Sequence, residues 1–418
     1  MMPKFAPLII FSIFISTAQE KNPKNFSISP ELLFGITGEP NTNFPDRGLQ
    51  KQVFIRFGWQ HTTQSDAWAS YLKNVKTGLS IGVADLGNSA QLGTIFTFQP
   101  FMEFKSFKSE KFSTSIGFGS SYITKKFDPT THKFNRAVST HLNWSFRLFL
   151  YYTLLASEAI DWRVGLGYNH NSNGHAKLPN QGYNSFLLSL GAELNPSKPS
   201  YKTSTPTERP VKSVSNYFSC RLGYGQNVLS EAFGTKKSVY TLSGDYGKVY
   251  NSILKLGVGA YVRFYETYYD YISNNESLVQ NGREFSDLSS NAFTNALNKG
   301  ISVKGELVLN HIGIEIQGGI NIFKPAYKVD WRINKGWGEV PKVIPESGGN
   351  FRLGDINEDY YKIKRTISAR LGLKYYFINT TKTPTDNVFI GAFINSNLGQ
   401  ADFSELAIGY VKTFSSKN

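Results

Sequence analysis

The chain is 418 residues long, 40% hydrophobic and 15% aromatic, and its formal net charge is +14. Beyond its first residues, no stretch approaches the roughly 18 consecutive apolar residues of a transmembrane helix, which excludes a helical membrane protein. The single cysteine, Cys220, excludes an internal disulfide, and the six scattered His show no metal-ligand spacing, so neither a metal nor another cofactor is expected.

The N-terminal segment has the pattern of a secretory signal peptide. Lys4 supplies a positive charge, residues 6–15 form an apolar core, and small residues at 16–18 provide a cleavage site. The apolar core is too short to span a bilayer as a helix. We therefore expect residues 1–18 to be removed during export.

Alternating apolar and polar residues predict β-strands in the part of the chain that follows. Residues 19–29 are polar and are predicted to be loose, and alternation begins near Leu33. The first clear stripe runs from Val53 to Trp59. Further strands are predicted at 79–86, 94–107, 112–123 and 138–154, separated by turns that contain Gly, Asn and Lys.

The next two strands flank a turn with an unusual polar content. In the strand that enters it, Trp162, Val164, Leu166 and Tyr168 share one face, and continuing this parity places His170 and Ser172 on the same face. The strand that leaves the turn has Phe186, Leu188 and Leu190 on its apolar face, which also includes Asn184. A His, a Ser and an Asn therefore extend an apolar stripe at the end of a hairpin.

These three side chains have the chemistry of a nucleophile, a base and an orienting group. Side chains at i and i+2 of a strand lie roughly 7 Å apart, and a neighbouring strand brings a third to about 5 Å. His170 could then hydrogen-bond both Ser172 and, across the hairpin, Asn184. The alternative is structural, because Asn, Ser, Gly and Pro are also common turn residues.

The motif resembles the signature of a known enzyme family. His170-x-Ser172-Asn173-Gly174, followed by Pro179-Asn180-x-Gly182-x-Asn184, is similar to the outer-membrane lipid A deacylases, also called acyloxyacyl hydrolases. These enzymes cut an ester-linked acyl chain from lipid A. The segment from Gly117 to Asp128 also resembles family members from Bacteroidetes-like bacteria.

The resemblance implies a role for each residue of the motif. Ser172 would be the nucleophile, His170 the general base, and Asn173 an oxyanion-hole residue, assisted by the Gly174 N–H. The third triad position is Glu in the best-known members and Asn184 here. An Asn can hold the imidazole in the useful tautomer, but it cannot stabilise the imidazolium with a full charge.

The chain changes character after the hairpin. Residues 195–213 contain four Pro and many Ser, Thr and Lys, so they are predicted to be a connection. Residues 214–418 again show strand patterns, at 254–264, 312–316, 367–377, 388–394 and 406–414. Cys220 is predicted to be a small buried residue in a strand. Two polar segments, 266–300 and 324–364, are predicted to be extracellular loops, with a short helix at 285–297.

Taken together, the patterns predict an all-β protein, an antiparallel transmembrane β-barrel of the outer membrane. Such barrels have low mean hydropathy, −0.29 in this chain, because only alternate strand residues face lipid. Residues 19–194 would form the part of the barrel with the His-x-Ser-Asn hairpin, and residues 214–418 would add further strands. A single barrel of about 12–14 strands is the first expectation, and two tandem barrels are the alternative.

The predicted function is that of an outer-membrane serine esterase acting on lipid A. The net charge fits a partner with phosphates, such as lipid A within lipopolysaccharide, whereas nothing in the sequence indicates nucleic-acid binding. The alternative is an inactive outer-membrane barrel that acts as a pore, a transporter or a surface-binding protein. Whether the embedded chain forms a homodimer is open.

Overall fold

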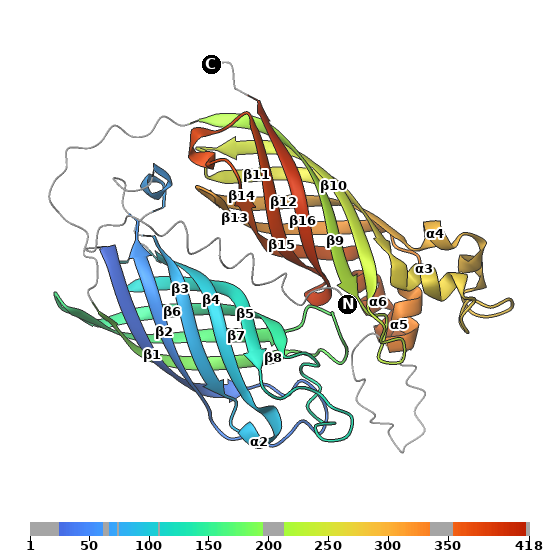
Figure 1. Ribbon diagram of the computed structural model, residues 1–418, viewed down its shortest axis with the longest axis horizontal. Coiled ribbons are helices and arrows are strands. Elements are labelled where there is room, and N and C mark those ends of the chain that lie inside the picture. Colours follow the sequence, from blue (N-terminus) through green and yellow to red (C-terminus); the bar gives the residue numbers. More distant parts are fainter. Residues whose placement is uncertain are drawn as a thin grey trace.

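The structure, a computed structural model, describes residues 25–61, 67–72, 75–107, 109–194, 213–334 and 354–414. The predicted signal peptide, 1–18, and the predicted connection up to residue 212 lie outside this part of the chain. None of the helices described is long and apolar enough to cross a membrane. The described residues form two closed antiparallel barrels of eight strands each, side by side (Figure 1).

The first barrel closes because its last strand pairs with its first. Each strand is antiparallel to the next, and Leu190 of the last strand lies opposite Leu32 of the first. The strands are β1 (Phe26–Thr37), β2 (Gln50–Gln60), β3 (Lys76–Asp85), β4 (Thr94–Lys105), β5 (Phe112–Ile123), β6 (Leu142–Ala156), β7 (Ile160–Ser172) and β8 (Tyr183–Leu194). Two short helices, η2 (Ala67–Ser70) and α2 (Ser89–Leu92), lie in its connections.

The second barrel closes in the same way, with its last strand beside its first. Ile408 lies opposite Leu222 in this pairing. The strands are β9 (Val214–Asn227), β10 (Lys237–Tyr250), β11 (Leu254–Tyr265), β12 (Leu297–Leu309), β13 (Ile312–Phe323), β14 (Ile367–Tyr376), β15 (Asp386–Asn397) and β16 (Gln400–Phe414). Its helices are α3 (Glu266–Ser273), η3 (Ser286–Ser290), α4 (Ala292–Asn295), α5 (Tyr327–Asn334), α6 (Gly354–Thr366) and η5 (Thr380–Lys382).

The predicted all-β barrel architecture is confirmed, but the expectation of one barrel with 12–14 strands is wrong. The described residues contain sixteen strands in two barrels, as in the tandem alternative. Alternation within a strand predicts which side chains face outward. It does not reveal which distant strand closes a barrel, because that depends on a pairing between chain segments such as β1 and β8.

Two smaller predictions also need correction. Residues 26–29 belong to β1 and are not loose, because Ser27 and Ser29 face the lumen, where polar residues fit a strand pattern. Cys220 lies in β9 and is only partly buried, on the outward face between Phe218 and Leu222. The predicted helical segment 285–297 contains η3 and α4.

Both lumens are filled with buried ion pairs. In the first barrel, Glu103 lies 2.6 Å from Arg56 and 2.8 Å from Arg163, which also pairs with Glu193 at 2.9 Å. In the second, Lys304 pairs with Asp245 at 2.6 Å. An eight-stranded barrel is only wide enough for its own side chains, so these charges bind each other across the interior.

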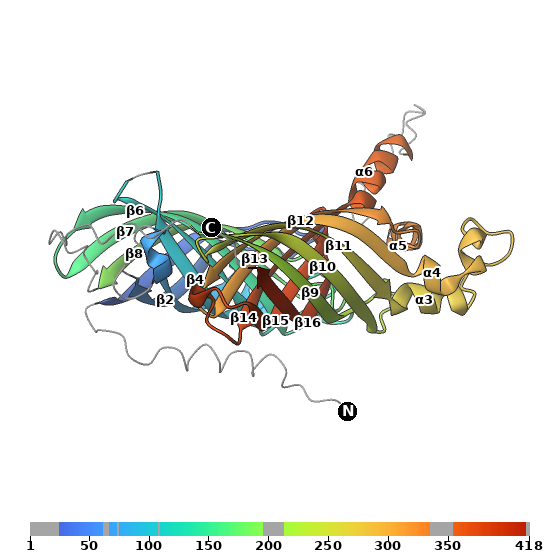
Figure 2. The same cartoon turned by 90° about the horizontal axis from the view of Figure 1, so that it is seen from above.

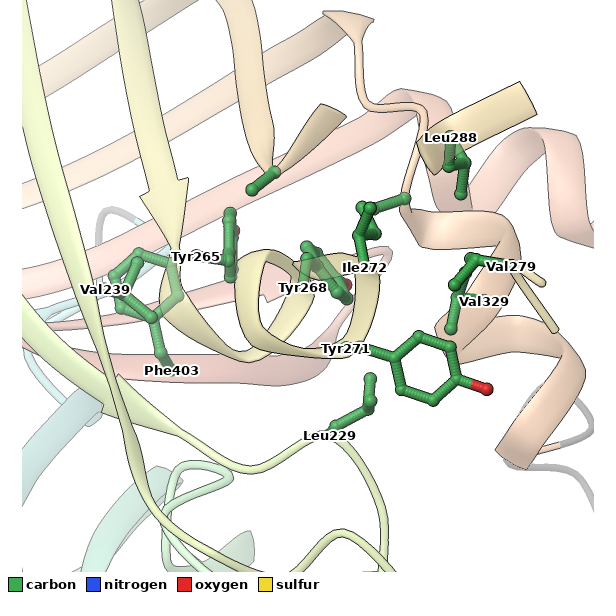
Figure 3. Packing of buried hydrophobic residues seen from close by; sticks show 12 residues of the cluster. Leu229, Val239, Tyr265, Tyr268, Tyr271, Ile272, Val279, Leu288, Val329 and Phe403 are labelled. Atoms are coloured by element: carbon green, nitrogen blue, oxygen red, sulfur yellow. The ribbon is translucent and has the colours of Figure 1, made fainter. Parts of the chain in front are cut away.

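Helices cover one end of the second barrel (Figures 1 and 2). Side chains of α3, of α5 and of the adjoining strands form a buried apolar cluster at this end (Figure 3). Tyr265, Tyr268 and Ile272 form its centre, and Val329 and Phe403 also belong to it. The cluster therefore closes the end of a lumen that is already filled.

Candidate active site

The hairpin of β7 and β8 places the candidate triad on the outer wall of the first barrel. Trp162 and Leu166 point outward and are 53% and 62% exposed, whereas Arg163 and Asn169 are buried in the lumen. His170 and Ser172 continue the outward face of β7, and His170 lies directly opposite Asn184 of β8. Because outward-facing and lumen-facing residues alternate along β7 and β8, the three polar side chains lie at the end of an apolar outer surface.

The three side chains form a continuous hydrogen-bonded chain. His170 Nε2 lies 3.0 Å from Ser172 Oγ, and His170 Nδ1 lies 2.7 Å from Asn184 Oδ1. Because an amide oxygen only accepts hydrogen bonds, Nδ1 must carry the proton. Nε2 is then free to accept the Ser172 hydroxyl proton. This is the tautomer that a general base needs.

Tyr168 fixes the orientation of the Asn184 amide. Its hydroxyl donates to Asn184 Oδ1 at 2.6 Å, so the same oxygen accepts bonds from Tyr168 and from His170. A reversed amide would leave the His170 Nδ1–H without its acceptor, so this orientation is the one that serves the base tautomer. Tyr168 was not predicted as a site residue; its position two residues before His170 on the same face was the available signal.

The turn between the strands is shaped to admit the imidazole. Gly182 has φ +78°, and a Cβ at this position would lie 2.7 Å from His170 Cε1. Only glycine satisfies both the backbone conformation and this close approach. Asn180 Oδ1 accepts the Asn173 N–H at 2.8 Å, which ties the two sides of the turn together.

The two residues predicted for the oxyanion hole, Asn173 and Gly174, differ in whether their N–H groups are already hydrogen-bonded. The Asn173 side-chain amide donates to the Lys177 carbonyl at 2.7 Å and to Ser139 Oγ at 3.1 Å, and its backbone N–H is bonded to Asn180. Its donors are therefore already engaged, within the turn and with the segment before β6. Among the described residues, no acceptor is bonded to the Gly174 N–H, which follows Ser172 by two residues.

Trp144 is an unpredicted neighbour of the candidate nucleophile. It lies directly opposite Ser172 in the β6–β7 pairing and stacks on Phe118, with ring centroids 5.1 Å apart. Ser172 itself is 6% exposed. On the other side, Leu166 and Phe186 are exposed at 62% and 60%. The site is thus covered on the β6 side and open on the β8 side.

A family model matches most of the first barrel. Residues 53–193 match the family model of lipid A 3-O-deacylase (PagL). The first barrel is PagL-like. The match includes β7, the turn and most of β8, which confirms the resemblance inferred from the motif. A search of curated proteins found no match.

Several solved structures are also similar to the chain. The outer-membrane enzyme PagL is 17% identical, with a TM-score of 0.27, over 39% of this chain and 97% of that one. Pseudomonas putida OprB is 12% identical, with a TM-score of 0.17, over 93% of both chains. A mutant porin of Rh. blastica is 8% identical, with a TM-score of 0.15, over 93% of this chain and 100% of that one.

His175 and Lys177 of the PagL-like turn lie in different environments. Despite its place in a turn, His175 is not solvated: it is 6% exposed, and its Nε2 lies 3.0 Å from the Val228 carbonyl. The sequence could not reveal this contact because Val228 belongs to the second barrel. Lys177 is exposed, as expected for a loop residue.

The second barrel has a serine at a comparable strand position, but among the described residues no base is hydrogen-bonded to it. Asn395-Ser396-Asn397 ends β15, the seventh strand of its barrel, and Asn171-Ser172-Asn173 spans the end of β7. Ile394 stands where His170 stands in the PagL-like barrel. Ser396 therefore has the position of a nucleophile without the means to activate it.

The described residues contain no group of three or more His, Cys, Asp or Glu arranged to hold a metal ion.

Proposed function

We propose that the protein is an outer-membrane esterase that removes an ester-linked acyl chain from lipid A. The observation that supports this most is the chain of hydrogen bonds from Asn184 through His170 to Ser172 on the outward face of β7. It lies within the residues that match the lipid A 3-O-deacylase family. Position, connectivity and family likeness therefore support the same reaction.

The reaction begins when Ser172 Oγ attacks the ester carbonyl carbon and its proton moves to His170 Nε2. Asn184 holds the Nδ1–H of the resulting imidazolium through its amide oxygen. The Gly174 N–H donates to the oxyanion of the tetrahedral intermediate. When the intermediate collapses, the C–O bond to the lipid breaks, and the departing oxygen takes the proton from Nε2.

The second half of the reaction releases the fatty acid. Water gives a proton to His170 Nε2 as its oxygen attacks the acyl carbon on Ser172. A second tetrahedral intermediate collapses, the bond to Ser172 Oγ breaks, and this oxygen recovers the proton from His170. The products are a free fatty acid and a lipid with one hydroxyl in place of the ester.

The outward position of the site explains why a lipid ester would be the substrate. Leu166 and Leu188, both 62% exposed, form an apolar wall beside the triad. In a membrane, this wall contacts acyl chains, so an ester could reach Ser172 without leaving the bilayer. The net charge of +14 favours a lipid with phosphate groups.

Mass spectrometry of lipid A incubated with the refolded protein tests the proposal. The wild type is expected to remove one ester-linked acyl chain, and Ser172→Ala is expected to remove none. Ser396→Ala is the matched control, because it makes the same change at the equivalent position of the second barrel and should retain full activity. Acyl release by Ser172→Ala equal to that of the wild type would contradict the proposal.

A further inference from the structure

Three contacts connect the second barrel to the surroundings of the candidate nucleophile. Trp144 Nε1 donates to Ser404 Oγ of β16 at 2.8 Å, and His175 Nε2 lies 3.0 Å from the Val228 carbonyl between β9 and β10. At the rim, Arg136 pairs with Glu231. Both His175 and Val228 are buried, at 6% and 1% exposure, so the contact excludes water.

Gly174 explains how closely the two barrels meet. Its φ is +64°, and a Cβ at this position would lie 2.3 Å from Ser404 Oγ and 3.0 Å from Trp144 Cδ1. The space that a side chain would need is already occupied by the second barrel. Ser404 therefore lies against the residue whose N–H is the candidate oxyanion donor.

The same contacts leave the site open on one side only. Trp144 is the cross-strand partner of Ser172, and Phe118 beneath it is 9% exposed although it faces outward. Phe186 and Leu188 of β8 are 60% and 62% exposed. An acyl chain therefore has free apolar wall along β7 and β8, away from Ser404.

We propose that the second barrel positions the catalytic turn and forms one wall of the ester site, with Ser404 as the positioning residue. Ser404 holds Gly174 through direct packing and holds Trp144 through a hydrogen bond. This inference rests on the proposed function, because the value of a fixed Gly174 N–H depends on an oxyanion that forms at Ser172. The second barrel thus contributes to hydrolysis without a nucleophile of its own.

A bulky residue at position 404 would displace the turn while leaving the entrance along β8 unchanged. A shift of about 1 Å in a reacting group can cost about 100-fold in rate. Ser404→Leu should therefore lower kcat by about 10- to 100-fold with little change in KM. Ser404→Thr keeps the hydroxyl that accepts the Trp144 N–H, so it should restore most of the activity.

The experiment compares the wild type, Ser404→Leu, Ser404→Thr and Ser396→Leu in the full-length protein. Ser396→Leu is the matched control, because it makes the same change on the outward face of the same barrel. Each is assayed on lipid A and on a short-chain nitrophenyl ester. Hydrogen exchange of residues 173–176 is measured in parallel, and heat-modifiable gel mobility checks that the barrels are folded.

The proposal expects a lower kcat on both substrates and faster exchange in Ser404→Leu only. Wild-type kcat together with wild-type exchange in folded Ser404→Leu would overturn the proposal and leave the proposed function standing. If the wild type hydrolyses neither substrate, the proposed function fails. The exchange data alone then decide whether the second barrel holds the turn.

Discussion

Asn184 is the main chemical difference between this site and a catalytic triad that contains a carboxylate. Its amide oxygen, 2.7 Å from His170 Nδ1, selects the right tautomer but gives the imidazolium no full charge. In a serine protease, the change from Asp to Asn at this position costs about 10⁴ in kcat, largely because the tautomer is wrong. Here Tyr168 donates to the same amide oxygen and favours the correct orientation, so we expect a smaller loss of kcat.

Asn184→Glu should therefore raise kcat for ester hydrolysis, by about tenfold if a full charge stabilises the imidazolium by about 1.4 kcal/mol more than the amide does. The Tyr168 hydroxyl can donate to the new carboxylate as it does to the amide. Steady-state kinetics on lipid A measure the effect. Asn184→Ala should lower kcat, and a variant with Ala that is as fast as the wild type would remove Asn184 from the mechanism.

Gly182 gives a second test at the scale of the residue. Gly182→Ala should lower kcat by about 100-fold, because its Cβ would lie 2.7 Å from His170 Cε1 and displace the base. Gly282→Ala is the matched control: Gly282 also has positive φ, +74°, but nothing lies within 4 Å of its Cβ position. If the two variants had equal kcat, the close approach of Gly182 to His170 would not be needed for hydrolysis.

Strand parity predicted that His170, Ser172 and Asn184 share a face, and the hydrogen bonds that join them confirm this placement. Sequence reasoning did not identify Trp144, whose closeness to Ser172 depends on the register between β6 and β7. It also assigned Asn173 to the oxyanion hole. The structure engages the donors of Asn173 with Lys177, Ser139 and Asn180, contacts that a linear motif does not reveal.

At the scale of the element, the strands of the first barrel are held by charge as well as by backbone pairing. Glu103 of β4 joins Arg56 of β2 to Arg163 of β7 across the lumen. Removing one partner of a buried pair typically costs 3–5 kcal/mol, because the other charge stays buried without compensation.

Glu103→Ala should therefore lower the free energy of unfolding by about 3 kcal/mol, measured by urea titration in lipid vesicles. Glu39→Ala provides the control, because Glu39 pairs with Arg47 on the surface with 70% of its side chain exposed. An exposed pair of this kind contributes at most about 1 kcal/mol. Similar losses in the two variants would show that the lumen network does not hold the barrel together.

At the scale of the whole molecule, two filled barrels argue against the pore alternative. Buried ion pairs occupy both interiors, and the apolar cluster around Tyr268 closes one end of the second barrel. The sequence predicted that alternate strand residues face lipid, but it could not distinguish one wide barrel from two narrow ones. A barrel of about 14 strands would leave room for water, whereas eight strands do not.

The protein in planar bilayers should therefore give no stepwise ion conductance, whereas a porin in the same bilayers gives clear steps. The recordings should use protein whose heat-modifiable gel mobility shows that it is folded. Regular steps that scale with the amount of protein would contradict the packed lumens and favour the pore alternative.

The central claim is that Ser172 is a nucleophile activated by His170. A fluorophosphonate bonds only to activated serines, so peptide mapping by mass spectrometry after labelling tests this claim most directly. We predict one adduct in the wild type, on the peptide that contains Ser172, and no adduct on the peptide that contains Ser396. In His170→Ala, the adduct on the Ser172 peptide should be lost. An unlabelled Ser172 in the folded wild type, or equal labelling in His170→Ala, would contradict the account.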